Sequence, residues 1–342
     1  GGRKLTIETG KLALLTHGSC TVRYGDTVIL ATVVQSKKVR DGIDYFPLMV
    51  DFEEKLYAAG KIKGSRFIKR EGRPSDEAIL AGRMVDRTIR PLFDNRVRSD
   101  VQVVVTALSV DGENDAAITA LIAASCAVSI SSIPWNGPIA AARVGRVNGE
   151  WRLNITGPEH DANPELNLVV AGTPDRLLMV EAGANEIFED DMYQAIEWGA
   201  KQLGPVIDLI KKVQKDVGHE KMPLPAVAET APGEMTAEQV QKLTREFVGS
   251  AAKTMIFDKP KVSRPERNTM LDAITEKAKA YLTEKNVPTE MQGAGLGNIK
   301  LYVEEEITLR ILEKDQRLDG RSLTDIRQLY IEVDLLPRTH GS

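Results

Sequence analysis

The stretch Lys61–Phe93, KIKGSRFIKREGRPSDEAILAGRMVDRTIRPLF, opens a locally basic part of an acidic chain. We call Lys61–Arg98 the basic segment. It contains 11 basic and five acidic residues, whereas the whole chain has a formal net charge of -4. Local positive charge of this kind favours a polyanionic partner. Phe67 and Ile68 lie inside the segment and add the apolar surface on which single-stranded nucleic acids stack.

The basic segment divides into a loop and a helix. Glycine and proline residues interrupt its first half and predict an exposed loop: Gly60, Gly64, Gly72 and Pro74. Ser75 has the properties of a helix N-cap, and the acidic residues after it suit the first helical turn. Pro91 predicts that this helix ends near Arg90.

The expected helix has an arginine row and an apolar side. Arg83, Arg87 and Arg90 are spaced four and three residues apart, so they share one face. The apolar side is expected to consist of Ile79, Met84 and Val85. Two interpretations stay open from composition alone: contact with a nucleic acid, or a solvated face with local ion pairs such as Asp86–Arg90.

Length and composition limit the possible fold classes and cellular compartments. The 342 residues suffice for two ordinary domains, and 42% hydrophobic and 27% charged residues are globular values. Cys20 and Cys126 are expected to be free buried thiols in a reducing compartment, the cytoplasm. No stretch approaches the roughly 20 apolar residues of a membrane span, so no membrane partner is expected. The chain starts without methionine and is interpreted as a piece of a longer polypeptide.

Hydrophobic periodicity predicts an α+β fold with mostly antiparallel strands for the first part of the chain. The expected strands are Lys4–Glu8, Thr21–Arg23, Val28–Val34, Asp44–Asp51, Val101–Val105, Ile139–Val147, Trp151–Ile155, Leu166–Gly172 and Leu177–Ala182. Hairpin turns are expected at Gly25-Asp26, just before Val28–Val34, and at Asn148-Gly149, between Ile139–Val147 and Trp151–Ile155. Val28–Val34 is expected to be buried on both faces. Asp115–Ser129 predicts a fully buried helix, and Glu189–Val217 an amphipathic one broken near Gly204-Pro205.

The last third predicts a separate helical module after a proline-rich linker. Its expected helices are Thr236–Ala252, Arg267–Lys285 and Leu301–Leu312, with a capping box at Thr236. The glycine-rich run Gly293–Asn298, GAGLGN, lacks the lysine and hydroxyl of a phosphate-binding loop and is expected to be a flexible loop. The four histidines are far apart and neither cysteine has a neighbour at metal-site spacing, so no metal site is expected.

The stretch Tyr45–Phe93 resembles the first RNase PH-like half of bacterial polynucleotide phosphorylase. That family shows FPL.VD...K.YAAGKIPG.F.KREGRPS.....R..DR.IRPLF there. From Asp315 onward, QRLDGRSLTDIRQLYIEVDLLPRTHGS resembles the opening of the family's second RNase PH-like half. The resemblance implies an RNase PH-like (ribosomal protein S5 domain 2-like) β-α sandwich at 1–218, a linker at 219–233, an all-helical domain at 234–312 and a truncated second RNase PH-like domain at 313–342.

The resemblance also implies a role for the loop. In the family a Phe–Phe–basic–basic run lines the mouth of a ring-shaped channel and holds single-stranded RNA; here the run is Phe67–Arg70, with Ile68 in place of the second aromatic residue. The expected RNA-binding residues are Phe67, Ile68, Lys69, Arg70, Arg73, Arg83, Arg87 and Arg90.

The family's catalytic groups come from the second half: an Arg-Gly-Glu-Thr-Gln turn, an Asn-Gly-Ser-Ser-Ser helix start and an Asp-x-Asp pair. Their first-half counterparts here carry Tyr24, Ala116, Ala117 and Asn167 in place of arginine, two hydroxyls and a carboxylate. Alanine cannot donate a hydrogen bond to phosphate, and Asp115 at a helix start would repel an anion. No catalytic residue and no metal ligand are therefore expected in this chain.

The parent protein is accordingly expected to be a phosphate-dependent 3′-to-5′ exoribonuclease in mRNA degradation. It would use magnesium (Mg2+), bound outside this chain, and inorganic phosphate as co-substrate. Its expected partners are single-stranded RNA, two further copies in a homotrimeric ring, and other RNA-decay proteins. The alternative is a non-catalytic RNA-binding or ring-scaffold protein, and a weaker one makes 234–312 a protein-interaction module.

Overall fold

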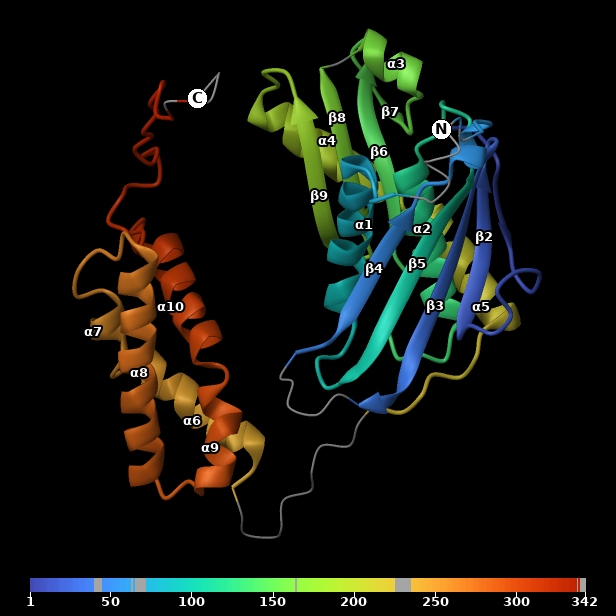
Figure 1. Cartoon of the computed structure of the whole chain (residues 1–342). Coiled ribbons are helices and arrows are strands. Elements are labelled where there is room, and N and C mark those ends of the chain that lie inside the picture. Colours follow the sequence, from blue (N-terminus) through green and yellow to red (C-terminus); the bar gives the residue numbers. More distant parts are fainter. Residues whose placement is uncertain are drawn as a thin grey trace. The chain divides into compact units, whose positions relative to one another are not determined.

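The computed structural model describes residues 1–39, 45–62, 64, 72–163, 165–224, 235–336 and 338. The chain forms two compact units, the N-terminal unit Gly1–Ala226 and the C-terminal unit Val227–Ser342. The first is built from strands and helices and the second from helices alone in the residues described (Figure 1). This confirms the expected α+β class followed by a helical region.

A five-stranded sheet with the order β1-β2-β3-β5-β4 forms one layer of the N-terminal unit. Its strands are β1 (Leu5–Glu8), β2 (Gly18–Tyr24), β3 (Thr27–Val39), β4 (Leu48–Glu53) and β5 (Ser99–Ser109). Only β4 and β5 pair in parallel; the other pairs of this sheet are antiparallel. The β2–β3 hairpin turns at Gly25-Asp26 as expected, with Gly25 at φ +63°, where a glycine avoids Cβ strain.

A second, antiparallel sheet has four strands in the order β7-β6-β8-β9. They are β6 (Ala140–Val147), β7 (Glu150–Leu153), β8 (Leu166–Gly172) and β9 (Leu177–Ala184). The predicted hairpin turn at Asn148-Gly149 is confirmed, because both residues have positive φ, 53° and 80°, as a type I′ turn requires.

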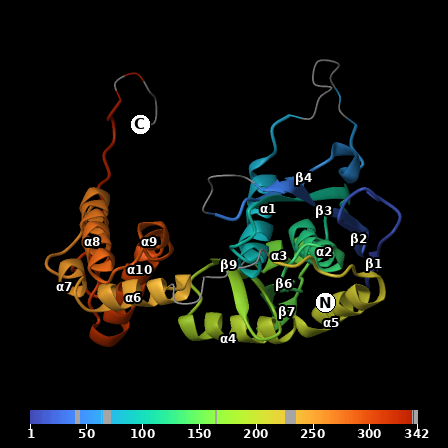
Figure 2. The same ribbon diagram turned by 90° about the horizontal axis from the view of Figure 1, so that it is seen from below.

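Two helices lie between the sheets (Figure 2). They are α1 (Asp76–Ile89) and α2 (Ala116–Ile130). The short helices η1 (Leu56–Ala59) and η2 (Arg90–Leu92) precede and follow α1, and α3 (Gly157–Ala162) joins β7 to β8. The helices α4 (Glu189–Lys201) and α5 (Gly204–Val217) complete the unit. Every residue of α2 from Ile118 to Ile130 is buried, which confirms the fully buried helix. The expected break before Gly204 is confirmed as well.

Burial on β3 differs from the expectation of a strand covered on both faces. Ile29, Ala31 and Val33 are fully buried against the helix layer, whereas Val28 and Leu30 are only half-buried. The expectation was wrong because the neighbouring strands are mostly antiparallel, and an antiparallel sheet can leave one face open. Cys20 and Cys126, expected as free buried thiols, are both free and buried.

The C-terminal unit consists of α6 (Ala237–Gly249), α7 (Lys253–Ile256), α8 (Arg264–Glu284), α9 (Thr289–Leu296) and α10 (Ile299–Lys314). The capping box at Thr236 is confirmed: its hydroxyl accepts from the Gln239 amide while the Gln239 side chain accepts from the Thr236 amide. No helix in the described ranges is both long and apolar enough to cross a membrane.

Two helices of this unit were not expected. The glycine-rich run from Gly293 was predicted to be a flexible loop, but most of it lies in α9, and Gly295 is buried. A Cβ on Gly295 would lie 2.1 Å from Thr244 Oγ1 on α6, so this glycine permits close helix packing rather than loop flexibility. The short α7 was missed too. The first residues of the expected linker pack against the N-terminal unit, where His219 N donates to Ile130 O at 2.9 Å. Residues 225–234 fall outside the described residues. The domain boundaries therefore stay a prediction.

Candidate nucleic-acid interface

The helix α1 presents the predicted arginine row to solvent. Ser75 caps it, because its hydroxyl accepts a 3.0 Å bond from the Ala78 amide. Arg83, Arg87 and Arg90 are all exposed, as their common face requires. The buried face differs from the expectation in one residue: Met84 and Val85 are buried, but Ile79 is 41% exposed. Ala78, Ala81 and Gly82 take its place, and small residues let α1 pack closely.

The three arginines of α1 are engaged to different degrees. Arg90 donates to Asp86 at 3.0 and 2.6 Å, which confirms the expected local ion pair. It also donates to the carbonyl oxygens of Phe46 and Leu48 at 3.4 and 3.1 Å, so it fastens α1 to the start of β4. Arg87 pairs with Glu181 on β9. Much of the hydrogen-bonding capacity of Arg90 is therefore spent inside the fold.

Arg73 and Arg83 are the free cations of this surface. Both are exposed, and neither makes a hydrogen bond or ion pair with another residue in the part of the chain that the structure describes. An arginine without a carboxylate partner keeps its five donors available for phosphate oxygens. Of the predicted contacts that can be seen, these two are best suited to a phosphate backbone.

The predicted loop residues Phe67, Ile68, Lys69 and Arg70 lie outside the described residues. The loop's two ends, however, are held together. Ser75 Oγ donates to Glu54 Oε2 at 2.6 Å, and Lys61 N donates to Leu56 O at 3.0 Å. The bond between Ser75 and Glu54 therefore holds the start of α1, where the predicted loop ends, beside the end of β4, from which the chain leads into it.

Sequence reasoning missed an aromatic side chain beside this loop. Tyr57 in η1 is 60% exposed although its neighbour Ala58 is buried, and Ile62 is 95% exposed. Exposed aromatic and apolar groups are surfaces on which the bases of a single-stranded nucleic acid stack. The signal was present in the sequence, because Tyr57 stands three positions before Gly60, the first glycine of the predicted loop. Its exposure, however, depends on how η1 packs on β5.

The three stretches that correspond to the family's catalytic motifs meet at one end of the N-terminal unit. Asp111 is their first link: its carboxylate accepts from Asp26 N and Thr27 Oγ1 of the β2–β3 turn at 2.9 and 3.0 Å. It also accepts from Asn114 N and Nδ2 at 2.8 and 2.6 Å. Partial burial opposes ionisation, yet these bonds from Asn114, Glu113 and Asp26 hold the pKa of Asp111 well below its ordinary value.

Asp115 and Arg143 form the second link. Asp115 caps α2 by accepting from the amides of Ala117 and Ile118 at 2.8 and 3.2 Å. Its other oxygen accepts from Arg143 Nε at 2.5 Å, and Arg143 also donates to Asn167 Oδ1 on β8. Both charged side chains are mostly buried, at 20% and 18% exposure. We call Asp115, Arg143 and Asn167 the internal ion-pair cluster.

This cluster is complete without a ligand. The Asp115 oxygens are taken by two amides and a guanidinium, and the guanidinium of Arg143 is neutralised by Asp115. A magnesium ion needs free oxygen ligands in octahedral geometry, and a neighbouring arginine would repel it. These residues therefore do not fit Mg2+. The structure has no group of three or more His, Cys, Asp or Glu side chains suited to a metal ion among the residues it describes.

The lowered pKa of Asp111 predicts that the stability of the N-terminal unit depends on pH. Because its pKa is lowered on folding, its stabilisation is fully present above the ordinary carboxyl pKa of 3.8 and is lost as pH falls below it. Asp111→Asn should lower the free energy of unfolding of the N-terminal unit by about 2 kcal/mol at pH 7, with a smaller difference at pH 3. Urea titrations followed by tryptophan fluorescence measure this unit alone, since Trp135, Trp151 and Trp198 all belong to it. An equal difference at both pH values would contradict the prediction.

Two family models match the N-terminal unit. One, "3' exoribonuclease family, domain 1", covers residues 1–134, and the other, "3' exoribonuclease family, domain 2", covers residues 137–202. The chain belongs to the 3′ exoribonuclease family. The first model spans the five-stranded sheet with α1 and α2, and the second spans the four-stranded sheet with α4.

Curated proteins named polyribonucleotide nucleotidyltransferase match over the whole chain. The polyribonucleotide nucleotidyltransferase of Dehalococcoides mccartyi (strain BAV1) is 41% identical over 342 residues, which are 100% of this chain and 45% of that protein. The enzymes of the same name from Heliobacterium modesticaldum and Bacillus cytotoxicus are 42% and 43% identical and are covered to 46%. The chain thus spans a little under half the length of these relatives.

A solved structure with the same fold is that of rice (Oryza sativa) Rrp46. It superimposes with a TM-score of 0.51 at 17% identity, over 62% of this chain and 95% of the rice chain. At this identity the match concerns the fold alone, and it confirms an RNase PH-like architecture for the N-terminal unit. In this member of the 3′ exoribonuclease family, the arginine row and the internal ion-pair cluster both belong to that architecture.

Proposed function

We propose that this chain is the N-terminal part of a polyribonucleotide nucleotidyltransferase, a phosphate-dependent 3′-to-5′ exoribonuclease that acts in mRNA degradation in the cytoplasm. In this proposal the N-terminal unit scaffolds a homotrimeric ring and guides single-stranded RNA. Bond cleavage, with its Mg2+ and orthophosphate, belongs to the second half of the parent protein. The match of the whole chain to a little under half of each of two polyribonucleotide nucleotidyltransferases supports the identity of the parent.

The observation that carries the guiding role is the contrast between two sets of arginines. Arg73 and Arg83 have no protein partner among the described residues, whereas Arg143 is neutralised by Asp115. A free guanidinium group can neutralise a backbone phosphate and release its counterion. A paired guanidinium must first break its ion pair with a carboxylate. The proposed RNA contacts remain those named from the sequence, from Phe67 to Arg90, and Tyr57 is added as a stacking residue.

The first test uses the double variant Lys69→Ala/Arg70→Ala. Losing two phosphate contacts should weaken binding of single-stranded RNA and lower the slope of log affinity against log salt by about 1.4. Fluorescence anisotropy at several salt concentrations measures both. Unchanged affinity together with an unchanged slope would refute the guiding role of the loop.

A matched pair of single variants tests the arginine row. Arg83→Ala removes an unpaired cation and should weaken RNA binding several-fold, with a slope lower by about 0.7. Arg96→Ala removes an equal charge from the same basic segment, but Asp94 holds that guanidinium at 2.9 and 2.7 Å. The Arg96 pair lowers the pKa of Asp94 to about 2, so the carboxylate stays charged and screens the arginine. Equal effects of the two substitutions would show that only net charge matters.

A second function, a non-catalytic RNA-binding or ring-scaffold protein, is favoured by one observation. The side chains of the internal ion-pair cluster occupy the place that corresponds to the family's phosphate site. The two functions differ in the parent: phosphorolysis by a chain extended past Ser342 supports the first, and its absence supports the second.

A further inference from the structure

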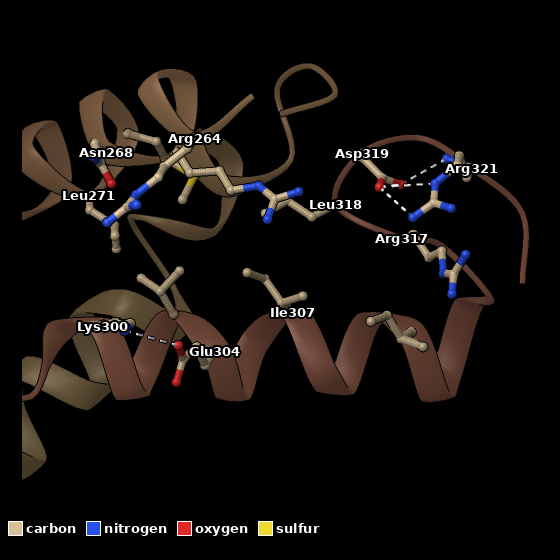
Figure 3. A pocket seen from close by; sticks show the side chains of 14 residues that line it. Arg264, Asn268, Leu271, Lys300, Glu304, Ile307, Arg317, Leu318, Asp319 and Arg321 are labelled. Carbon is tan, nitrogen blue, oxygen red and sulfur yellow. Dashed lines mark hydrogen bonds and ion pairs between the residues drawn. The ribbon is translucent and has the colours of Figure 1, made fainter. Parts of the chain in front are cut away.

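The C-terminal unit contains a pocket that the RNA-guiding surface does not use. It has a volume of about 410 Å³ and lies between α8, α10 and the segment Arg317–Arg321 that follows α10 (Figure 3). This volume is in the range of small-molecule sites in proteins. We call it the helical-unit pocket.

The segment that closes the pocket is fixed to the helices. Lys261 N donates to Leu318 O at 2.9 Å, and the Leu318 side chain packs on the core of the unit. Gly320 has φ +81°, and a Cβ there would lie 3.0 Å from Pro260. The wall is therefore built into the fold of this unit.

One side of the pocket is apolar. Its apolar lining comes from both helices and the segment: Met270, Leu271, Val303, Ile307, Ile311 and Leu318. Ile307 points from α10 into the space that Leu318 borders in Figure 3. A lining of this kind offers a surface for the face of a flat, weakly polar group.

The remaining lining is strongly basic. Five cations, Arg264, Arg267, Lys300, Arg317 and Arg321, surround the pocket with two carboxylates, Glu304 and Asp319. Asp319 is already bound by Arg321 at 3.1 and 2.9 Å, and Glu304 lies 3.9 Å from Lys300. These pairs are the dashed lines of Figure 3.

Three arginines at the pocket have no carboxylate partner in the described residues. Arg267 and Arg317 donate only to backbone carbonyls, at 3.2 Å to Lys261 O and 3.2 Å to Asp325 O, and no bond is made by the Arg264 side chain. Unpaired guanidinium groups beside an apolar wall select an anion with several oxygen atoms.

We propose that the helical-unit pocket binds a nucleoside diphosphate. The base lies against the apolar lining around Ile307, and the two phosphates face Arg264, Arg267 and Arg317. An anion without an apolar part would leave that lining unused, and an uncharged nucleoside would leave the arginines unpaired. The inference goes beyond the proposed function and does not depend on it, because it concerns the C-terminal unit alone.

The experiment is isothermal titration calorimetry of the 342-residue chain with ADP, adenosine and pyrophosphate. ADP should bind, and adenosine and pyrophosphate should each bind at least tenfold more weakly. Arg264→Glu should weaken ADP binding at least tenfold, and so should Ile307→Trp, which fills the apolar side. Lys277→Glu makes the same charge change as Arg264→Glu on an exposed part of α8 outside the pocket and should leave the affinity unchanged.

Three results would overturn the proposal. Pyrophosphate binding as tightly as ADP would mean that the arginines hold any small anion. Equal ADP affinity in Arg264→Glu and Lys277→Glu would remove the pocket from the binding site. ADP binding that is lost in Lys69→Ala/Arg70→Ala and retained in Arg264→Glu would assign the nucleotide to the RNA-guiding surface. Circular dichroism of each variant distinguishes lost binding from lost folding.

Discussion

Supplied with single-stranded RNA, orthophosphate and Mg2+, the 342-residue chain is expected to release no nucleoside diphosphate. Phosphorolysis requires donors for the attacking phosphate and a cation to offset charge at the scissile bond. The corresponding place here presents Ala116, Ala117 and Asn167, and the guanidinium of Arg143 beside them is bound to Asp115. A site already satisfied by its own groups cannot accept an anion without first breaking those bonds.

The measurement is thin-layer chromatography of products from 3′-labelled RNA, beside a chain extended past Ser342 that is proposed to restore activity. The Arg143→Met variant is the control for a contaminating nuclease, since a contaminant is unaffected by a change in this chain. Nucleoside diphosphate release by the unmodified chain that disappears in Arg143→Met would mean that the internal ion-pair cluster is catalytic.

Replacing Arg143 with methionine is expected to lower the free energy of unfolding of the N-terminal unit by about 3 kcal/mol. Methionine keeps much of the apolar stem of arginine, so the effect is mainly the loss of the charge partner. Asp115 would stay mostly buried as a carboxylate without its cation, and Asn167 would lose its donor. Urea unfolding followed by tryptophan fluorescence measures the change.

A double-mutant cycle separates this pair from general damage. Asp115→Asn alone keeps an N-cap side chain but leaves Arg143 without its carboxylate. In the Arg143→Met background, Asp115→Asn removes the isolated charge and should cost less than it does alone, with a coupling of at least about 1 kcal/mol. Arg176→Met is the matched control, because its pair with Asp175 is 76% and 73% exposed and should contribute little. Additive effects of the two cluster substitutions would contradict a stabilising ion pair.

Local chemistry made several elements predictable from sequence. The turn at Asn148-Gly149, the cap at Ser75 and the break at Gly204-Pro205 depend on one to four neighbouring residues. Backbone conformation at such positions is set by sterics and by short-range hydrogen bonds, so the sequence alone decides it. The spacing of Arg83, Arg87 and Arg90 placed them on one exposed face for the same reason.

Burial and pairing required the tertiary structure. Ile79 has the hydrophobicity of a core residue, yet it is exposed because small residues pack α1 onto β4. The glycine-rich run from Gly293 is mostly helical because it packs against α6. Arg87 differs from Arg83 only because Glu181, 94 residues away, lies within its reach. Likewise, Ala116 and Asn167, which differ from the family's catalytic motifs, predicted that the catalytic groups are missing here. They did not predict that the Arg143 side chain would occupy the space.

The sequence by itself thus determined the class of fold, the helix starts and turns, and which stretches carry positive charge. Only the folded chain decided which of those charges are free to meet a phosphate and which are neutralised inside. The physical reason is that the free energy of a charged side chain depends on the groups within a few ångströms of it, and those groups come from strands and helices distant in sequence.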